Sequence, residues 1–274
     1  MKRVITSLLF ALSFSAMGFS QVKSESSLLW EISGNNLKKP SYLFGTIHVI
    51  CKENFFFPEI VKEKFLAANE VFLELDLADS AVNAKLMNAL QRTNGKTIQQ
   101  LLGENRFKKF DSLFMKITGE SAKQYNNYRP LLLIGKLSNQ IKICEQTDSY
   151  ELWFVDLAAM HKMKIMGLET IEESVTIFDA ITDSVFGTAL YEFALNFQQQ
   201  IRNSQLQESL YKTQDIDVIF HQAVEEVEVF GNEFVAVHKR RNQNWIPIMQ
   251  NSMLKGPSFF AVGAAHLGGD IGVI

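Results

Sequence analysis

The chain has 274 residues, of which 47% are hydrophobic and 21% charged, the composition of an ordinary globular protein with one sizeable core. Its 27 basic and 30 acidic residues form no large basic cluster, and the only basic triplet is Lys239-Arg240-Arg241. Nucleic-acid binding depends on clustered Lys and Arg side chains that neutralise phosphates, so a nucleic-acid partner is not expected.

The N-terminus predicts export. A basic start at residues 1–3 precedes an apolar run over residues 4–17, and small residues, Gly18 and Ser20, occupy positions −3 and −1 of a cleavage point. This pattern is typical of a secretory signal peptide, residues 1–20. The apolar run is shorter than the roughly 20 residues that span a bilayer.

After cleavage, residues 21–274 are expected to form a single domain that is periplasmic or extracellular. No cysteine sits at the cleavage point, so a stable membrane anchor is not indicated. Loss of Lys2 and Arg3 leaves 25 basic and 30 acidic residues, a net charge of −5. The oligomeric state is not encoded in any feature of the sequence.

The mature chain begins with two apolar runs, Leu28–Ser33 and Tyr42–His48. The turn-rich residues 34–40 join them and predict a β-hairpin. A helix is expected from Pro58 to Ala68, and β character returns over Val71–Leu77.

The middle of the chain is dominated by helical patterns. Helices are predicted over residues 80–92, 104–118, 130–145 and 150–161. Lys164–Leu168 is a short strand that ends at Glu169. Residues 171–254 contain little Gly or Pro and should form long helices, with a kink or an end at Pro247. The breaks between these helices are expected near Gly187, Ser209 and Gly231.

A final strand is predicted over Ser258–Ala265. Strands therefore come from the first third, the middle and the end of the chain, with helices inserted between them. This order predicts an α/β fold with α+β character, in which a small mixed central sheet carries extensive helical insertions.

Two segments at opposite ends of the mature chain share one pattern. Residues 41–48 and 259–266 are both β-prone apolar runs that reach a Gly-x-x-His. Glycine permits close approach of a backbone or ligand, and each histidine should emerge at the carboxyl end of its strand, where open α/β sheets bind ligands. We expect the two strands to be adjacent, with His48 and His266 in one cavity. The alternative is two unrelated strand ends that happen to carry histidine.

Six stretches in this order resemble the TraB/GumN family, which includes the animal TIKI proteins and has distant similarity to erythromycin esterases and ChaN-like proteins. The stretches are residues 29–33, 42–49, 71–76, 167–173, 241–242 and 262–269. The resemblance implies a metal-dependent hydrolase with peptidase activity in its animal members. The family normally continues with a further helix and strand, so a fragment or a member without that closing segment is expected.

A hydrolytic metal site needs a few nitrogen and oxygen ligands and an open position for water. His48, Glu74, Glu169 and His266 are the predicted ligands of a divalent ion such as Mn, Co or Zn, with water activated between His48, Glu169 and His266. Glu74 lies on an apolar strand, where a charge needs a partner, and Glu169 could instead be an acid near a helix start.

Arg241 is the predicted cationic group of the cleft, able to pair with a site carboxylate or to stabilise an oxyanion. Thr46 shares a strand face with His48 and could orient ligand or water. His161, His221 and His238 lack acidic or glycine context and are expected to be surface or half-buried residues. No His-Glu-x-x-His or Gly-x-Ser-x-Gly motif is present.

The expected function is hydrolysis of a peptide or small-molecule substrate, with a peptidase activity favoured and an ester hydrolase as a further possibility. The alternative is a non-catalytic exported protein that binds a metal, haem or peptide in the same cleft. Cys51 and Cys144 are the only cysteines. They could form a disulfide in an oxidising compartment or remain two free buried thiols.

Overall fold

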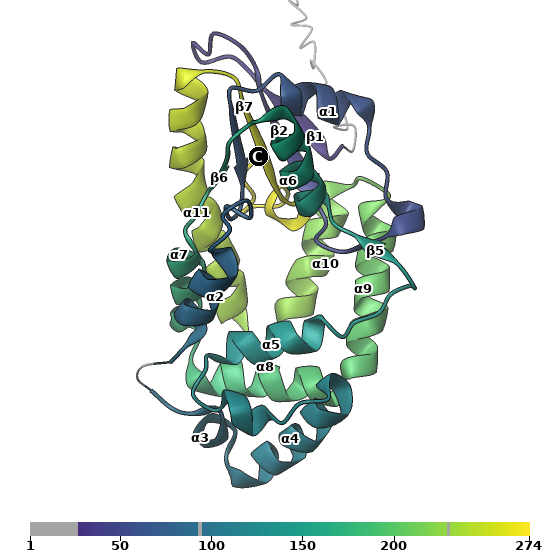
Figure 1. Ribbon diagram of the computed structural model, residues 1–274, viewed down its shortest axis with the longest axis vertical. Coiled ribbons are helices and arrows are strands. Elements are labelled where there is room, and N and C mark those ends of the chain that lie inside the picture. Colours follow the sequence, from purple (N-terminus) through teal and green to yellow (C-terminus); the bar gives the residue numbers. More distant parts are fainter. Residues whose placement is uncertain (1–26, 93–94, 229–230) are drawn as a thin grey trace, which may run out of the picture.

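The computed structural model describes residues 27–92, 95–228 and 231–274 (Figure 1). The predicted signal peptide, residues 1–20, lies outside the described residues. None of the described helices is both long and apolar enough to cross a membrane.

A five-stranded sheet lies in the upper part of the molecule (Figure 1), with the strand order β1-β2-β7-β4-β6. Strand β1 is antiparallel to β2, which confirms the predicted hairpin, and β2, β7, β4 and β6 run parallel to one another. The predicted adjacency of the two Gly-x-x-His strands is also confirmed, because β2 pairs directly with β7. The strands are β1 Leu29–Ile32, β2 Ser41–Thr46, β4 Glu70–Leu73, β6 Ile165–Gly167 and β7 Ser258–Gly263.

Both faces of this sheet are buried, because side chains alternate between them along each strand. Leu43 and Phe260 point to one face and pack against Trp245 and Met249 of α11 (Asn232–Lys255). The opposite face packs against Phe65 of α1 (Glu59–Leu66) and against α6 (Tyr150–His161). The continuous apolar character of β2 and β7 follows from this double burial.

A second sheet was not predicted from the sequence. It consists of β3 (Ile50–Cys51) and β5 (Thr147–Asp148), each two residues long and antiparallel to the other. Strands of two residues carry no periodic pattern, so sequence periodicity cannot reveal them.

Helices make up most of the remaining described chain, and the lower part of the molecule is entirely helical in Figure 1. Phe107, Phe110, Leu133 and Leu190 lie in the core of this helical region. The further helices are α2 Val82–Leu90, α3 Ile98–Leu102, α4 Glu104–Thr118, α5 Pro130–Ser138, α7 Ile171–Thr176, α8 Asp183–Leu195, α9 Phe197–Tyr211 and α10 Ile216–Glu228.

The helix predicted over residues 130–145 is wrong in its second half, because α5 ends at Ser138. Two tertiary contacts hold the following segment in a non-helical path. Cys144 is bonded to Cys51, and the backbone carbonyl of Gln146 accepts a hydrogen bond from the backbone N–H of Lys52.

Two of the predicted breaks in the C-terminal helices are confirmed: Gly231 precedes α11 with a φ of +127°, and α9 ends at Tyr211, close to Ser209. Gly187 lies inside α8, where a Cβ atom would come within 2.5 Å of a Leu101 side-chain carbon. That glycine therefore serves close helix packing and not termination. The helix α11 continues through Pro247.

Candidate functional site

The site residues lie where the four parallel strands end. His48 follows β2 by two residues, Glu74 and Glu169 follow β4 and β6, and His266 ends the 3₁₀ turn η4 (Ala264–His266) after β7. Parallel strands place their carboxyl ends at one edge of a sheet. Segments separated by more than 200 residues in the sequence therefore meet at this edge.

Arg241 of α11 bridges the two carboxylates. Its Nη2 donates to Oε2 of Glu74 at 2.8 Å and to Oε1 of Glu169 at 2.7 Å. Its Nε also donates to Oε1 of Glu169 at 3.1 Å, and the indole Nε1 of Trp245 donates to Oε2 at 3.0 Å. Both oxygens of Glu169 are thus engaged by protein donors, and Arg241 pairs with both carboxylates at this edge of the sheet.

Glu74 keeps one oxygen turned toward the histidines. Its Oε1 accepts the backbone N–H of Gly263 at 2.8 Å and lies 4.0 Å from Nε2 of His266. Burial alone would raise the pKa of Glu74, but the charge of Arg241 and the Gly263 hydrogen bond hold this pKa well below its usual range. Glu74 is therefore a carboxylate at neutral pH.

His266 is buried and held in one tautomer. Its Nδ1 lies 2.6 Å from Oδ1 of Asn242, an acceptor, so Nδ1 carries the proton and Nε2 keeps its lone pair. Burial lowers the pKa of His266 well below its ordinary value, so the ring is neutral. The Nε2 atom of His266 faces the cleft and lies 3.4 Å from Nη1 of Arg241.

His48 is held in the same manner by Glu151, the second residue of α6. Nδ1 of His48 lies 2.9 Å from Oε1 of Glu151, which also accepts the Thr46 hydroxyl at 2.5 Å. Partial loss of hydration opposes the charge on the imidazole, but the hydrogen bond and the charge of Glu151 raise the pKa of His48 to about 9, although its side chain remains exposed. Thr46 and His48 were predicted to share a strand face, and both side chains contact the same oxygen of Glu151.

Gly263 lies between the side chains of Glu74, His266 and His48. A Cβ atom there would lie 3.3 Å from Oε1 of Glu74, 3.7 Å from Cδ2 of His266 and 3.8 Å from Nε2 of His48. The second motif's glycine thus leaves space for all three side chains to approach one point. Gly45 has a different purpose, because its Cβ would lie 3.1 Å from the backbone of Ala264.

Two contributors were missed by the sequence analysis. His238 is half-buried, as predicted, but it also stacks on His266 with ring centroids 3.8 Å apart and lies beside the cavity, a position that was not predicted. Its spacing gave a usable signal, because His238, Arg241, Asn242 and Trp245 recur at i, i+3, i+4 and i+7 and so share one helix face. Glu151 gave no such signal, since its partner lies 103 residues away in the sequence.

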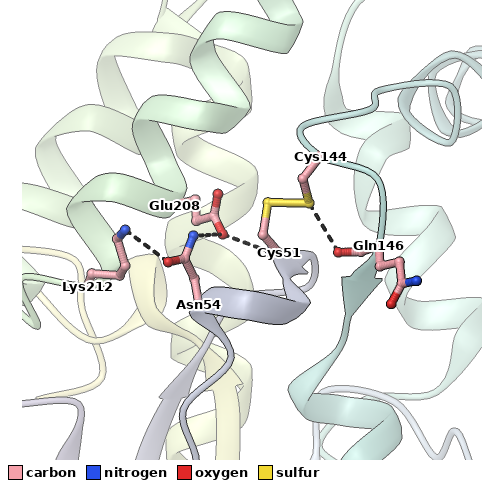
Figure 2. The surroundings of a disulfide bond; sticks show 6 residues. All are labelled: Cys51, Asn54, Cys144, Gln146, Glu208 and Lys212. Carbon is pink, nitrogen blue, oxygen red and sulfur yellow. Dashed lines mark hydrogen bonds between the residues drawn. A yellow bond between two sulfur atoms is a disulfide. The ribbon is translucent and has the colours of Figure 1, made fainter.

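The disulfide between Cys51 and Cys144 secures the segment that follows His48 (Figure 2). The backbone N–H of Cys51 also donates to Oε1 of Glu208 on α9 at 2.7 Å, and Asn54 donates to the same oxygen. This disulfide, together with the β3–β5 pairing, joins the chain just after His48 to the chain just before Glu151. The sequence left open whether the two cysteines form a disulfide or remain free thiols, and the structure contains the disulfide.

Within the described residues, no group of three or more His, Cys, Asp or Glu side chains is arranged to hold a metal ion. The donors nevertheless suit a divalent ion in type. Ligands that share an ion at 2.0–2.2 Å are at most about 4.4 Å apart, and Nε2 of His266 and Oε1 of Glu74 are 4.0 Å apart. Both histidines bind a hydrogen-bond acceptor through Nδ1, as metal-binding imidazoles usually do.

The other residues that the sequence analysis weighed are either enclosed behind Arg241 or exposed at the surface. Glu169 lies behind Arg241 and faces Trp245, so it is less accessible to an ion than Glu74. Lys239 and Arg240 are exposed on α11, as expected of solvated helix charges. His161 and His221 are also exposed and lie away from the cavity beside the site.

The chain belongs to the TraB/PrgY/gumN family, whose pattern matches residues 28–274. It is 23% identical to the protein named Metalloprotease TIKI2 of Danio rerio over 312 residues, and 23% identical to the Metalloprotease TIKI homolog of Nematostella vectensis over 318 residues. Each match covers 92% of this chain, but the chain spans only 59% and 65% of the length of these relatives.

A shorter match to the human protein named Metalloprotease TIKI1 is 38% identical over 77 residues, which are 28% of this chain and 15% of that protein. No solved structure shows significant similarity to the chain.

Proposed function

We propose that the chain is an exported metal-dependent hydrolase, with peptide bonds as its substrates. The observation that carries the proposal is the convergence of His48, His266 and Glu74 around Gly263 at the carboxyl edge of the sheet. The metalloprotease names of the relatives support the same class of reaction. The expected export and the predicted signal peptide belong to this proposal.

The residues that would hold the ion are His48 and His266 through Nε2 and Glu74 through Oε1. A bound divalent ion would supply a Lewis acid that lowers the pKa of water. The predicted ligand Glu169 is assigned a different role here, because Arg241 and Trp245 engage both of its oxygens. Glu169 would hold Arg241 in place beside the ligands.

Arg241 supplies a fixed positive charge at the edge of the cleft. Its Nη1 is directed toward His266 at 3.4 Å, while Nη2 is held between the two carboxylates. A guanidinium fixed by ion pairs needs little reorganisation to stabilise an oxyanion that develops nearby. Glu151 and Asn242 hold the two imidazoles through Nδ1 and leave both Nε2 atoms directed into the cleft. His266 is neutral, whereas His48, with a pKa of about 9, would release its Nε2 proton on binding an ion.

The test is metal analysis of the purified protein, followed by a peptidase screen with and without chelator. His48→Ala and His266→Ala should each weaken metal binding by at least about 100-fold and abolish chelator-sensitive hydrolysis. His221→Ala, on an exposed site away from the cavity, is the matched control and should resemble the parent. Metal binding without hydrolysis of any peptide or ester would instead favour the non-catalytic binding protein.

A further inference from the structure

A cavity of about 470 Å³ opens beside the two histidines and runs between α9 and α10. Tyr211, at the end of α9, marks its end nearest the site, because its hydroxyl donates to the backbone carbonyl of Gly45 at 2.9 Å. Gln200, eleven residues earlier on the same helix, also lines the cavity. A helix of that length rises about 16 Å, the length of roughly five residues of extended chain.

Gln200 is a largely buried residue whose side-chain amide has no protein partner. Its residue is 8% exposed, and its side chain makes no hydrogen bond to any residue that the structure describes. Gln222 of α10 lines the same cavity and likewise has no side-chain hydrogen bond to a described residue. No fully buried side-chain nitrogen or oxygen of the described residues lacks a partner, so the unbonded amide of Gln200 is open to the cavity, where it is placed to hydrogen-bond a ligand's polar group.

The lining of this cavity is nearly free of charge away from the histidines. It includes no Lys or Arg, and its one acidic residue is Glu226. The carboxylate of Glu226 accepts a hydrogen bond from Gln207, and burial raises the pKa of Glu226. An anionic ligand group would lose its hydration here without gaining a counter-charge, so ligands without negative charge are favoured.

Apolar side chains occupy much of the remaining wall, among them Ile141, Ile143, Phe193 and Ile219. A side-chain amide offers one acceptor and two donors, which match the N–H and C=O of a peptide group. Aliphatic walls and isolated amides together suit a chain whose apolar side chains and polar backbone alternate along its length.

We propose that this cavity binds an extended, uncharged peptide segment next to the bond that is hydrolysed, with Gln200 and Gln222 as the residues that hydrogen-bond its backbone. The inference rests on the proposed function, since it assigns the substrate side of the same site. Its test, however, needs neither bound metal nor turnover.

The probe is a set of fluorescently labelled hexapeptides, acetylated and amidated at their ends and built from Leu, Val, Ser and Gln. Binding to the metal-free protein is followed by anisotropy. Gln200→Ala and Gln222→Ala should each weaken binding about two- to ten-fold, the effect of one lost neutral hydrogen bond. Gln205→Ala, on an exposed position of the same helix, is the control and should not change it. Replacing a central residue of the peptide by Asp should weaken binding by at least about ten-fold.

Gln200→Met keeps the volume of the side chain and removes its hydrogen-bonding atoms, so it replaces Gln200→Ala if that variant does not fold. Equal dissociation constants for the Gln200 variant and Gln205→Ala would overturn the inference, as would failure of every uncharged peptide to bind. If hydrolysis remains chelator-sensitive in that case, the proposed function stands alone. Peptide binding without any hydrolysis would support the cavity assignment and contradict the proposed function.

Discussion

Arg241 determines how the two carboxylates of the site differ. The guanidinium takes both oxygens of Glu169 but a single oxygen of Glu74, and Trp245 completes the enclosure of Glu169. The remaining Glu74 oxygen faces His266 at 4.0 Å. Glu74 and Glu169, at the ends of neighbouring strands, thus have different surroundings: Glu74 faces the histidines, and Glu169 is held by Arg241 and Trp245.

The first prediction separates these two acids. Glu74→Gln should weaken metal binding about 10–100-fold or more and lower turnover by about 10²–10⁴-fold, because it removes the charge that faces the histidines. Glu169→Gln should act chiefly on stability, since a buried arginine loses part of its counter-charge, and breaking such pairs costs about 3–5 kcal/mol. Metal titration and thermal melting of both variants measure the two effects.

A matched control for this comparison is Glu172→Gln, which alters an exposed acid in the first turn of α7. It should leave metal affinity unchanged and alter the melting temperature only slightly. Loss of metal binding in Glu169→Gln together with full binding in Glu74→Gln would exchange the two roles.

At the residue scale, the sequence was sufficient for those groups whose position follows from the end of a strand. His48, Glu169 and His266 belong to this class, because apolar β runs lead directly to them. Glu74 was instead predicted inside a strand over Val71–Leu77, but β4 ends at Leu73 and Glu74 follows it. Glu151 was beyond reach, since nothing local marks the second residue of a helix as the partner of a histidine in another element. Such partners are fixed by tertiary packing.

At the scale of elements, the same distinction holds. The hairpin, α4 and α6 were predicted closely because their periodicity and flanking residues agree with their tertiary surroundings. The end of α5 was not, because a disulfide and the β3–β5 pairing draw residues after Ser138 out of a helical path.

The contact between the β2 end and α6 predicts a pH dependence in the metal-free protein. The pKa of His48 is raised to about 9 in the folded state, above the ordinary value of 6.5. Its ion pair with Glu151 therefore stabilises the fold fully below about pH 6.5, and this contribution is lost as the pH rises through about 9.

Glu151→Gln should consequently lower the melting temperature more at pH 6 than at pH 9.5. The difference should be about 2–4 °C or less, because an ion pair with an exposed partner contributes up to about 1 kcal/mol, and the His48 side chain is 67% exposed. In a His48→Ala background the same substitution should show no such pH dependence. An equal loss at both pH values in the parent background would contradict the ion pair.

The disulfide supplies the next prediction at this scale. Cys51 and Cys144 are 93 residues apart in the sequence, and closing a loop of that length is expected to stabilise a fold by up to about 4–5 kcal/mol. Reduction, or Cys144→Ser, should lower the melting temperature and also weaken metal binding, because the segment after His48 loses one of its anchors (Figure 2).

Cys51→Ser/Cys144→Ser should reproduce the effect of the reductant, and the reductant should then have no further effect on the double variant. Reduced protein with unchanged metal affinity would show that the β3–β5 pairing and the Glu208 hydrogen bond are enough to hold this segment.

At the scale of the whole molecule, the site is built from both ends of the described chain. His48 comes from its first strands and His266 from its last, and the helical insertions between them form the cavity walls. His48, Glu74 and His266 are far apart in the sequence, so the unfolded chain does not bring them together. Binding of an ion by these three side chains therefore requires the closed sheet, which makes metal affinity a measure of global folding.

The last prediction follows from this coupling. A ligand that binds the folded state alone stabilises it by about 2.7 kcal/mol at a free concentration of 100 times its dissociation constant. Addition of the preferred divalent ion to the metal-free protein should therefore raise the melting temperature by about 5–10 °C, and chelator should reverse the shift. The shift should vanish in His48→Ala and in His266→Ala and persist in His221→Ala. His48 and His266 follow neighbouring strands, β2 and β7, that come from opposite ends of the chain. Equal shifts in all three variants would therefore show that the ion binds elsewhere and not at this edge of the sheet.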